Sequence, residues 1–320
     1  MARIFPSALL AVVSLLLPPS GLAGEWNPDK SVKIVVPFNP GGGTDQQARL
    51  VEKEFMEEFG QPLRFVYKPG ADGAVGATEL KDYPADGYNI AVHTFPLIMM
   101  NTLTGKGRYS MDDFDYLGIS SLDVAVLVTR RESPLDTLEK FVETARSRPD
   151  RKLTVGVVEV LGPSHIAALK LQRLGVPMNI IPMAGGAKGI AAVLGGHLDA
   201  LMSVKGASLN TVSKLNVLAV ASSGADPDLS GVPTFTERGF PVEAAAARIW
   251  IAPRGLPDDV KARYEEGFRR IYGKDDVKSR LAGAGQPVTF ESGQELGRMV
   301  EAFEQEAGEL VEYYTATKGR

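Results

Sequence analysis

Short runs of β-branched and other apolar residues alternate with helical patterns along the chain, and this alternation limits the possible folds most. Residues 32–38 (VKIVVPF) predict a strand, and residues 45–59 predict a helix with Ala48, Val51, Phe55 and Phe59 on one face. Further strands are expected at 64–67, 88–93, 124–129, 153–158, 179–181, 198–203, 217–221 and 249–252. The pattern predicts an α/β protein with parallel, doubly wound sheets.

The length of the chain predicts more than one hydrophobic core. It has 320 residues, whereas a single core stops growing at roughly 250–300 residues. We therefore expect two lobes. Residues 294–314 follow them as a long amphipathic helix whose apolar stripe packs on the core.

Charge and cysteine content exclude several classes of function. Lys plus Arg number 35 and Asp plus Glu number 39, so a net charge of −4 leaves no basic excess for binding nucleic acid. The chain has no cysteine. This excludes disulfides, thiolate metal sites, cysteine nucleophiles and a lipid anchor on cysteine.

The first 23 residues predict a signal peptide. Arg3 gives a short positive segment, residues 4–17 are almost wholly apolar, and prolines then end the helix. Gly21 and Ala23 supply small residues before the expected cleavage point near Ala23. The alternative is a retained membrane anchor, which the short apolar run disfavours. We therefore expect an exported protein.

The segment 36–45 (VPFNPGGGTD) predicts a loop that can hold an anion. A buried strand ends there, three glycines allow close approach of the backbone, and a helix is expected to start at Thr44, with Thr44 and Gln47 as a capping box. Free N–H groups in the first turn of a helix favour a carboxylate or a phosphate. The alternative for this segment is a tight strand-to-helix turn that binds no ligand.

Two later segments repeat this strand, glycine and helix arrangement. Residues 162–165 (GPSH) follow the strand that ends near residue 158, and residues 182–187 (PMAGGA) follow the strand at 179–181. Three such loops at strand ends predict one cleft ringed by helix N-termini.

Recognisable catalytic motifs are missing from the sequence. His93, His165 and His197 are far apart and have no metal-binding spacing, and no G-x-S-x-G motif is present. We therefore expect no metal, no cofactor and no catalytic residues. A binding protein is favoured, and a periplasmic two-domain enzyme acting on a small carboxylate is the alternative.

Several motifs occur in a characteristic order. V-P-F-x-P-G-G-x-T-D is present at 36–45, R/K-P-G-A-x-G at 68–73 and P-x-D-G-Y at 84–88. They are followed by LGGHLD at 194–199, VPTF at 232–235 and APRG at 252–255. Together these motifs resemble those of the periplasmic solute-binding proteins of tripartite tricarboxylate transporters, the family of the Bordetella uptake gene products. The resemblance extends from Trp26 to the end of the chain.

The resemblance implies a type II periplasmic-binding-protein fold, in which two α/β lobes enclose a ligand cleft and are joined by crossing strands. We expect the signal peptide at 1–23, lobe 1 at 24–123 plus 249–320, and lobe 2 at 124–248. The crossing strands are then 124–129 and 249–252. The implied function is capture of a small carboxylate-bearing organic acid in the periplasm and its delivery to membrane transporter subunits. A monomer that binds no nucleic acid is expected.

The resemblance also implies which residues bind the ligand. In the first lobe they are Phe38, Pro40, Gly41, Gly42, Gly43, Thr44, Asp45 and Thr94; in the second lobe they are Gly162, Ser164, His165, Gly185, Gly186, Ala187 and Ser203.

The donors expected to hold the acid are neutral groups, namely the N–H groups of residues 42–45 and the hydroxyls of Thr44, Thr94, Ser164 and Ser203. Lys188, Lys205 and Arg248 are the basic residues near the second-lobe loops, and the sequence does not decide whether any of them touches the ligand. Asn39 stands where many family members have a second proline. Arg248 stands where many have an aromatic residue and others an arginine.

Overall fold

The computed structural model describes residues 26–317, apart from residues 149, 184 and 210. The predicted signal peptide lies outside the described residues. The strands are β1 (Val32–Val36), β2 (Leu63–Tyr67), β3 (Asn89–Phe95), β4 (Phe114–Arg130), β5 (Leu153–Val158), β6 (Met178–Met183), β7 (Ala200–Val204), β8 (Leu215–Val220) and β9 (Ala245–Pro253). Each strand expected from the sequence overlaps one of these.

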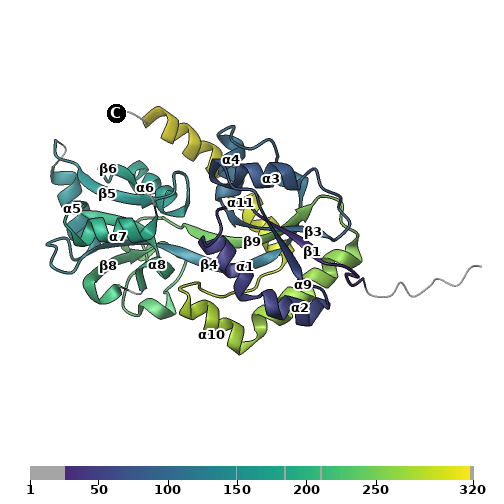
Figure 1. Cartoon of the computed structure of the whole chain (residues 1–320). Coiled ribbons are helices and arrows are strands. Elements are labelled where there is room, and N and C mark those ends of the chain that lie inside the picture. The colour runs from purple at the N-terminus through teal and green to yellow at the C-terminus, as the bar shows by residue number, and fades with distance from the viewer. Residues whose placement is uncertain (1–25, 149, 184, 210, 318–320) are drawn as a thin grey trace, which may run out of the picture.

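Helices cover the sheet on both sides (Figure 1). They are α1 (Gly43–Leu50), α2 (Glu52–Phe59), α3 (Ala74–Leu80), α4 (Leu97–Leu103), α5 (Leu138–Ser147), α6 (Pro163–Arg173), α7 (Gly186–Leu194), α8 (Lys205–Leu209), α9 (Asp258–Gly273), α10 (Asp275–Gly283) and α11 (Gly293–Thr317). The helix predicted over 45–59 is therefore two helices, α1 and α2, which are separated at Val51. Its predicted apolar face is nevertheless fully buried.

The strands form a continuous hydrogen-bonded path in the order β2-β1-β3-β9-β4-β7-β5-β6, and β8 also pairs with β4. The pairs β1–β2, β1–β3, β5–β6 and β5–β7 are parallel, as expected. The prediction of parallel sheets fails at β4 and β9, because β9 is antiparallel to β3 and β4, and β4 is antiparallel to β7 and β8.

β4 is the long strand that joins the two halves of this sheet (Figure 1). From Phe114 to Val124 it pairs with β9, and from Ala125 onwards it pairs with β7 and β8. We call the part built on β2, β1, β3 and β9 the β1 half, and the part built on β6, β5, β7 and β8 the β5 half.

Each half has its own apolar core. In the β1 half, aromatic rings from α2 and α9 pack on the sheet, and Trp250 on β9 stacks on Phe268 of α9 at a centroid distance of 4.5 Å. In the β5 half, Phe141 and Leu171 are fully buried between helices and sheet. Burial of large apolar side chains on both sides of a sheet stabilises such a layered arrangement.

The last helix, α11, connects the two halves along one side of the molecule (Figure 1). Its apolar stripe is buried against β4 and α4, with Leu296 and Leu310 fully inaccessible. Its polar side reaches α6, where Glu306 pairs with Lys170 and Glu309 pairs with Arg173, both at 2.8 Å. Within residues 26–317, no helix combines the length and the apolar character needed to cross a bilayer.

Candidate functional site

The first glycine-rich loop lies between β1 and α1, and internal hydrogen bonds fix its shape. Gly41 has a φ of +80°, a conformation that glycine adopts without strain. One carboxylate oxygen of Asp45 accepts a hydrogen bond from the Gly41 N–H at 2.7 Å, and the other accepts from Arg49 Nε at 3.1 Å. The charge of Asp45 is therefore neutralised within the β1 half, where the residue shapes the loop.

The capping box expected at Thr44 and Gln47 is wrong. The N-cap residue is Gly42, the helix begins at Gly43, and no side chain caps it. Gln47 is instead buried and donates from Nε2 to Ser120 Oγ on β4 at 3.1 Å. Because no side chain caps α1, its first N–H groups are available to an anion.

Arg248 on β9 lies beside this loop. Its guanidinium Nη1 donates to Thr94 Oγ1 on β3, the residue opposite it in the antiparallel ladder. A β-carbon built on Gly43 would stand 3.3 Å from Nη2 of Arg248. The cation therefore lies against the backbone at the start of α1, next to two residues that the sequence predicted for the site.

No carboxylate of residues 26–317 lies within ion-pair distance of Arg248. Protein surrounds the side chain, although it keeps some contact with solvent, and this burial lowers its pKa. A guanidinium is always protonated and carries five N–H donors. A surrounded but accessible guanidinium without an ion-pair partner is therefore suited to an incoming anion.

The other two basic candidates do not share these properties. Lys205 is buried, but Asp226 and Asp228 each pair with it at 2.8 Å. Lys188 on α7 is exposed, so solvent screens its charge. Of the three basic residues that the sequence left undecided, the structure singles out Arg248.

Two carboxyl groups face Arg248 without pairing with it. Asp123 lies on β4, and its Oδ1 accepts a hydrogen bond from the Gly206 N–H at 3.0 Å. Glu159 follows β5 in the loop before α6, and its carboxylate has no hydrogen-bond partner within the described part of the chain. Both negative charges interact with the charge of Arg248. Burial raises the pKa of Asp123 to about 6 and also raises the pKa of Glu159.

The second glycine loop, between β5 and α6, has an unusual backbone. Glu159 and Leu161 have φ values of 60° and 61°, which are uncommon for residues other than glycine. Ser164 Oγ donates to Val158 O at 2.6 Å and accepts from Val158 N at 2.8 Å. His165 Nδ1 accepts from Leu161 N at 2.8 Å. Ser164 and His165 thus hold the loop in this conformation.

The third loop precedes α7. Gly185, the N-cap residue, has a φ of +102° and is exposed, as is Ala187. A β-carbon on Gly186 would lie 3.2 Å from the Ala207 side chain of α8. Ser203 is fully buried on β7. These residues belong to the α7–α8 side of the β5 half, and the contacts of the described residues do not join them to Arg248.

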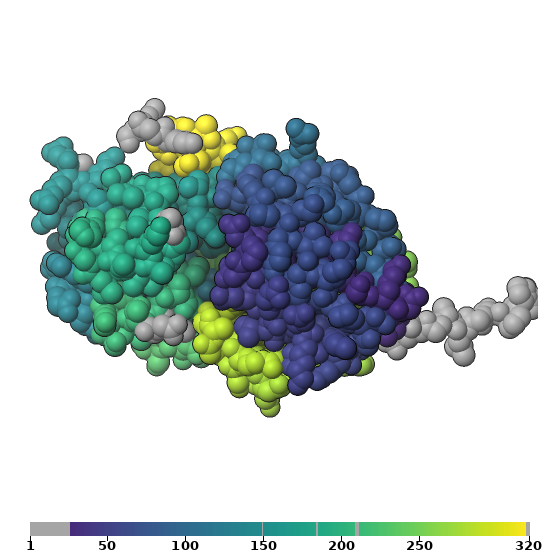
Figure 2. Space-filling view, in the orientation of Figure 1, coloured from purple at the N-terminus to yellow at the C-terminus, as the bar shows by residue number. Residues whose placement is uncertain are grey.

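The two halves meet closely along a line that we call the seam. Gly43, Arg248 and Gly285 lie on the β1 half, facing Glu159 and Gly206 of the β5 half. A β-carbon on Gly206 would stand only 1.9 Å from the Gly285 carbonyl oxygen. Gln286 Nε2 donates to the Gly43 carbonyl at 3.0 Å from the same side. Figure 2 shows the seam as a hollowed boundary between the purple loop region and the teal-green part.

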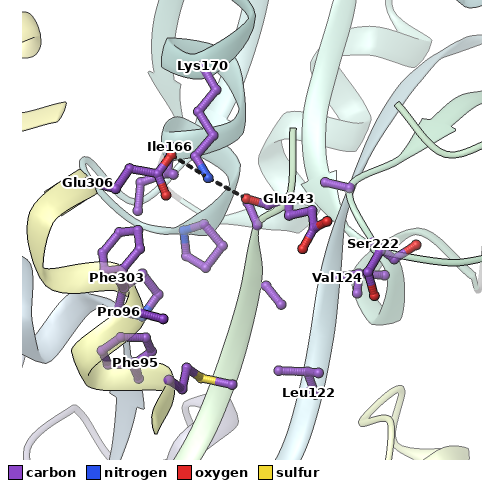
Figure 3. Close-up of a pocket in the computed structure, with 17 residues that line it drawn as sticks. Phe95, Pro96, Leu122, Val124, Ile166, Lys170, Ser222, Glu243, Phe303 and Glu306 are labelled. Atoms are coloured by element: carbon purple, nitrogen blue, oxygen red, sulfur yellow. Dashed lines mark hydrogen bonds and ion pairs between the residues drawn. The ribbon is translucent and has the colours of Figure 1, made fainter. Parts of the chain in front are cut away.

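A separate cavity of about 340 Å³ lies beside β4 and β9, between α6 and α11 (Figure 3). Leu122 and Val124 line it, and they alternate along β4 with Asp123, so the cavity opens on the opposite face of the sheet from Arg248. Of the described residues in the three predicted glycine loops, only Pro163 lines it. Its cation, Lys170, is paired with Glu306 and donates to the Glu243 carbonyl at 2.7 Å. The seam is the better candidate site.

The structure therefore brings some predicted residues together and separates others. Gly43 and Thr94 contact Arg248, and the N–H groups of residues 42–45 lie at the same helix start. Phe38 packs edge-on against the buried His93 ring at 5.3 Å, whereas Pro40 is exposed. Gly162 lies beside Glu159. Sequence reasoning left Arg248 undecided and did not select Asp123 or Glu159.

The fold, with the seam between its two halves, is that of a solute-binding protein. A TctC solute-binding protein from Polaromonas superposes with a TM-score of 0.80 at 25% identity, over 89% of this chain and 99% of that one. MatC from Rhodopseudomonas palustris with bound malate superposes with a TM-score of 0.72 at 26% identity, over 89% and 99% of the two chains. These likenesses confirm the predicted fold class.

The chain belongs to the tripartite tricarboxylate transporter receptor family, TctC, whose model matches residues 47–315. It is also 27% identical to the protein BugT of Bordetella pertussis over 314 residues, which are 94% of this chain and 95% of BugT. The family predicted from the ordered motifs is thus confirmed. A receptor, rather than an enzyme, is the class of protein that this membership supports.

Proposed function

We propose that this protein binds a small organic carboxylate at the seam, in the periplasm, and delivers it to the membrane subunits of a tripartite tricarboxylate transporter. Membership of the TctC receptor family supports this role, and MatC, which shares the fold, carries malate. Export by a signal peptide at residues 1–23 and a monomeric state are parts of the same proposal.

The observation that carries the proposal is the position of Arg248. Its guanidinium has no ion-pair partner within residues 26–317, and it lies beside the uncapped start of α1 at Gly43. A carboxylate there would accept charge-assisted hydrogen bonds from the guanidinium and bonds from the helix N–H groups. A single small anion would satisfy both sets of donors.

We further propose that the lobes move relative to one another when the ligand binds. Lobe 1 would comprise residues 24–123 and 249–320, and lobe 2 residues 124–248. The change of pairing partner along β4 at Val124 and Ala125 supports this division. The predicted site residues Thr44 and Thr94 would act from lobe 1, and the loop from Gly162 to His165 would act from lobe 2. Closure of two lobes around a ligand is the usual motion in such proteins.

A thermal-unfolding screen tests the proposed function. The protein lacking residues 1–23 is heated with malate, succinate, L-norvaline or 4-aminobutyrate at increasing concentrations. A ligand present at 100 times its Kd should add about 2.7 kcal/mol to the free energy of unfolding. We expect a concentration-dependent rise in Tm with at least one acid. No rise with any of the four at millimolar concentration would contradict carboxylate binding.

A further inference from the structure

We infer that the ligand carries an ammonium group in addition to its carboxylate, so that Arg248 binds the carboxylate while Asp123 and Glu159 bind the ammonium. The preferred ligand is then a zwitterionic amino acid or a close relative. This inference rests on the proposed function of the seam, and it names the chemical class that the seam selects.

The first step concerns the donors of Arg248. Thr94 Oγ1 accepts one bond from Nη1, and the register places Thr94, Arg248 and Ser121 on one face of the sheet. The other N–H groups of the guanidinium have no hydrogen-bond partner among the described residues. Since a guanidinium presents two parallel donors to a carboxylate, the remaining edge can bind a carboxylate of the ligand.

The second step concerns the two carboxyl groups opposite. Asp123 follows Ser121 on the same face of β4, and Glu159 comes from the β5 half across the seam. Asp123 accepts a single bond, from the Gly206 N–H, whereas the carboxylate of Glu159 accepts none within residues 26–317. Neither lies within 4 Å of Arg248. A ligand bound at the seam would therefore be surrounded by the cation Arg248 and by two carboxylate acceptors, Asp123 and Glu159. Both halves of the sheet supply these groups.

The third step concerns the exposure of these groups. Glu159 is solvent-accessible and Asp123 and Arg248 are half-buried, yet the surrounding protein withdraws enough water to shift the pKa of each. Groups that are surrounded by protein and still touch solvent line a concave site. Burial raises the pKa of both carboxyl groups because no cation close enough to compensate lies beside them.

The fourth step is the balance of charge. Lys205 also interacts with Asp123, but its charge is neutralised by Asp226 and Asp228. Asp72 also interacts with Glu159, but Lys106 pairs with it and neutralises its charge, so Asp123 and Glu159 remain as the uncompensated charges. The surroundings of Arg248 are thus negative. A second carboxylate on the ligand would be repelled there, while an ammonium would be attracted.

Calorimetry with matched pairs of acids at pH 7.5 tests this inference. L-norvaline differs from valerate by one ammonium, and 4-aminobutyrate carries a –CH2NH3+ group where succinate has its second carboxylate. In each pair we expect the ammonium-bearing acid to bind at least tenfold more tightly. Tighter binding of succinate or valerate would overturn the inference and leave carboxylate binding intact. Failure of all four acids to bind would contradict the proposed function itself.

Variants show whether the two carboxyl groups cause the preference. Glu159→Gln and Asp123→Asn should each reduce the ratio of the two affinities within a pair at least threefold. Glu312→Gln, at an exposed position on α11, should leave this ratio unchanged. Because Glu159 has no side-chain hydrogen bond to lose, its variant keeps the test valid even if Asp123→Asn destabilises the fold. An unchanged preference in Glu159→Gln would overturn the inference, as would an equal change in Glu312→Gln.

Discussion

Arg248 on β9 and Gly43 at the start of α1 approach so closely that a methyl group on Gly43 would stand 3.3 Å from the guanidinium. The contact joins the cation to a helix start that no side chain caps. Both groups attract an anion, and their juxtaposition gives two independent sets of donors for one carboxylate.

We predict that Gly43→Val lowers affinity for the best-binding acid by at least tenfold, about 1.4 kcal/mol. The added side chain would occupy space beside the guanidinium that the ligand requires, but Gly43 is exposed and the fold should persist. Calorimetry and circular dichroism on the same sample separate the two effects. Gly308→Val, where nothing lies within 4 Å of an added β-carbon, should bind like the parent protein. Unchanged affinity in Gly43→Val would contradict the position assigned to the ligand.

We predict that Gly206→Ala impairs closure of the seam. The new β-carbon would stand 1.9 Å from the Gly285 carbonyl oxygen, which is backbone and cannot rotate away, so the halves must separate. Small-angle scattering should show a larger radius of gyration than for the parent protein, and affinity should fall at least threefold. Gly224→Ala, which has open space around it, is the control. A scattering curve and an affinity equal to those of the parent protein would contradict a closed seam.

A third prediction concerns pH. Burial lowers the pKa of His165 to about 4, whereas the unfolded chain should titrate near 6.5. Between these values the unfolded state binds the additional proton, so the free energy of unfolding falls as the pH falls. His165→Asn does not titrate there, and its amide oxygen can still accept the Leu161 N–H.

Urea unfolding at pH 7 and pH 5 checks this prediction. From pH 7 to pH 5 the parent protein should lose up to about 2 kcal/mol more stability than His165→Asn. His93, Asp123 and Glu159 titrate in both proteins, so their contributions cancel in the comparison. Equal losses would show that His165 keeps an ordinary pKa in the native state.

The strands were predictable from the sequence because their residues are apolar in short, uninterrupted runs. The segment Leu153–Val158 matches its predicted bounds. β4 was recognised only over residues 124–129, since small and polar residues at Gly118, Ser120 and Ser121 interrupt the pattern in its first part, where the ladder with β9 is irregular. Its antiparallel pairing could not be predicted, because the partner strands are distant in sequence.

The candidate site was predictable only in part, because some of its contacts join residues that are distant in sequence. Glycine-rich turns after strands have a local signature, so the loop at Gly41–Gly43 was found. The N-terminal cap of α1 was misassigned to Thr44 and Gln47, because Gln47 instead bonds to a buried partner on β4. No local sequence pattern reveals that partner. The importance of Arg248 depends on the absence of a nearby carboxylate, and that is a property of the folded chain.

The most direct test of carboxylate binding at the seam is calorimetry of Arg248→Gln beside Lys188→Ala, using the acid that the parent protein binds most tightly. We predict that Arg248→Gln loses at least a hundredfold in affinity, because the charge-assisted bonds to the carboxylate disappear. Lys188→Ala should change affinity less than threefold, because the lysine is exposed. Parent-like affinity in Arg248→Gln, in a protein whose unfolding transition is intact, would contradict the assignment of Arg248 as the group that binds the carboxylate.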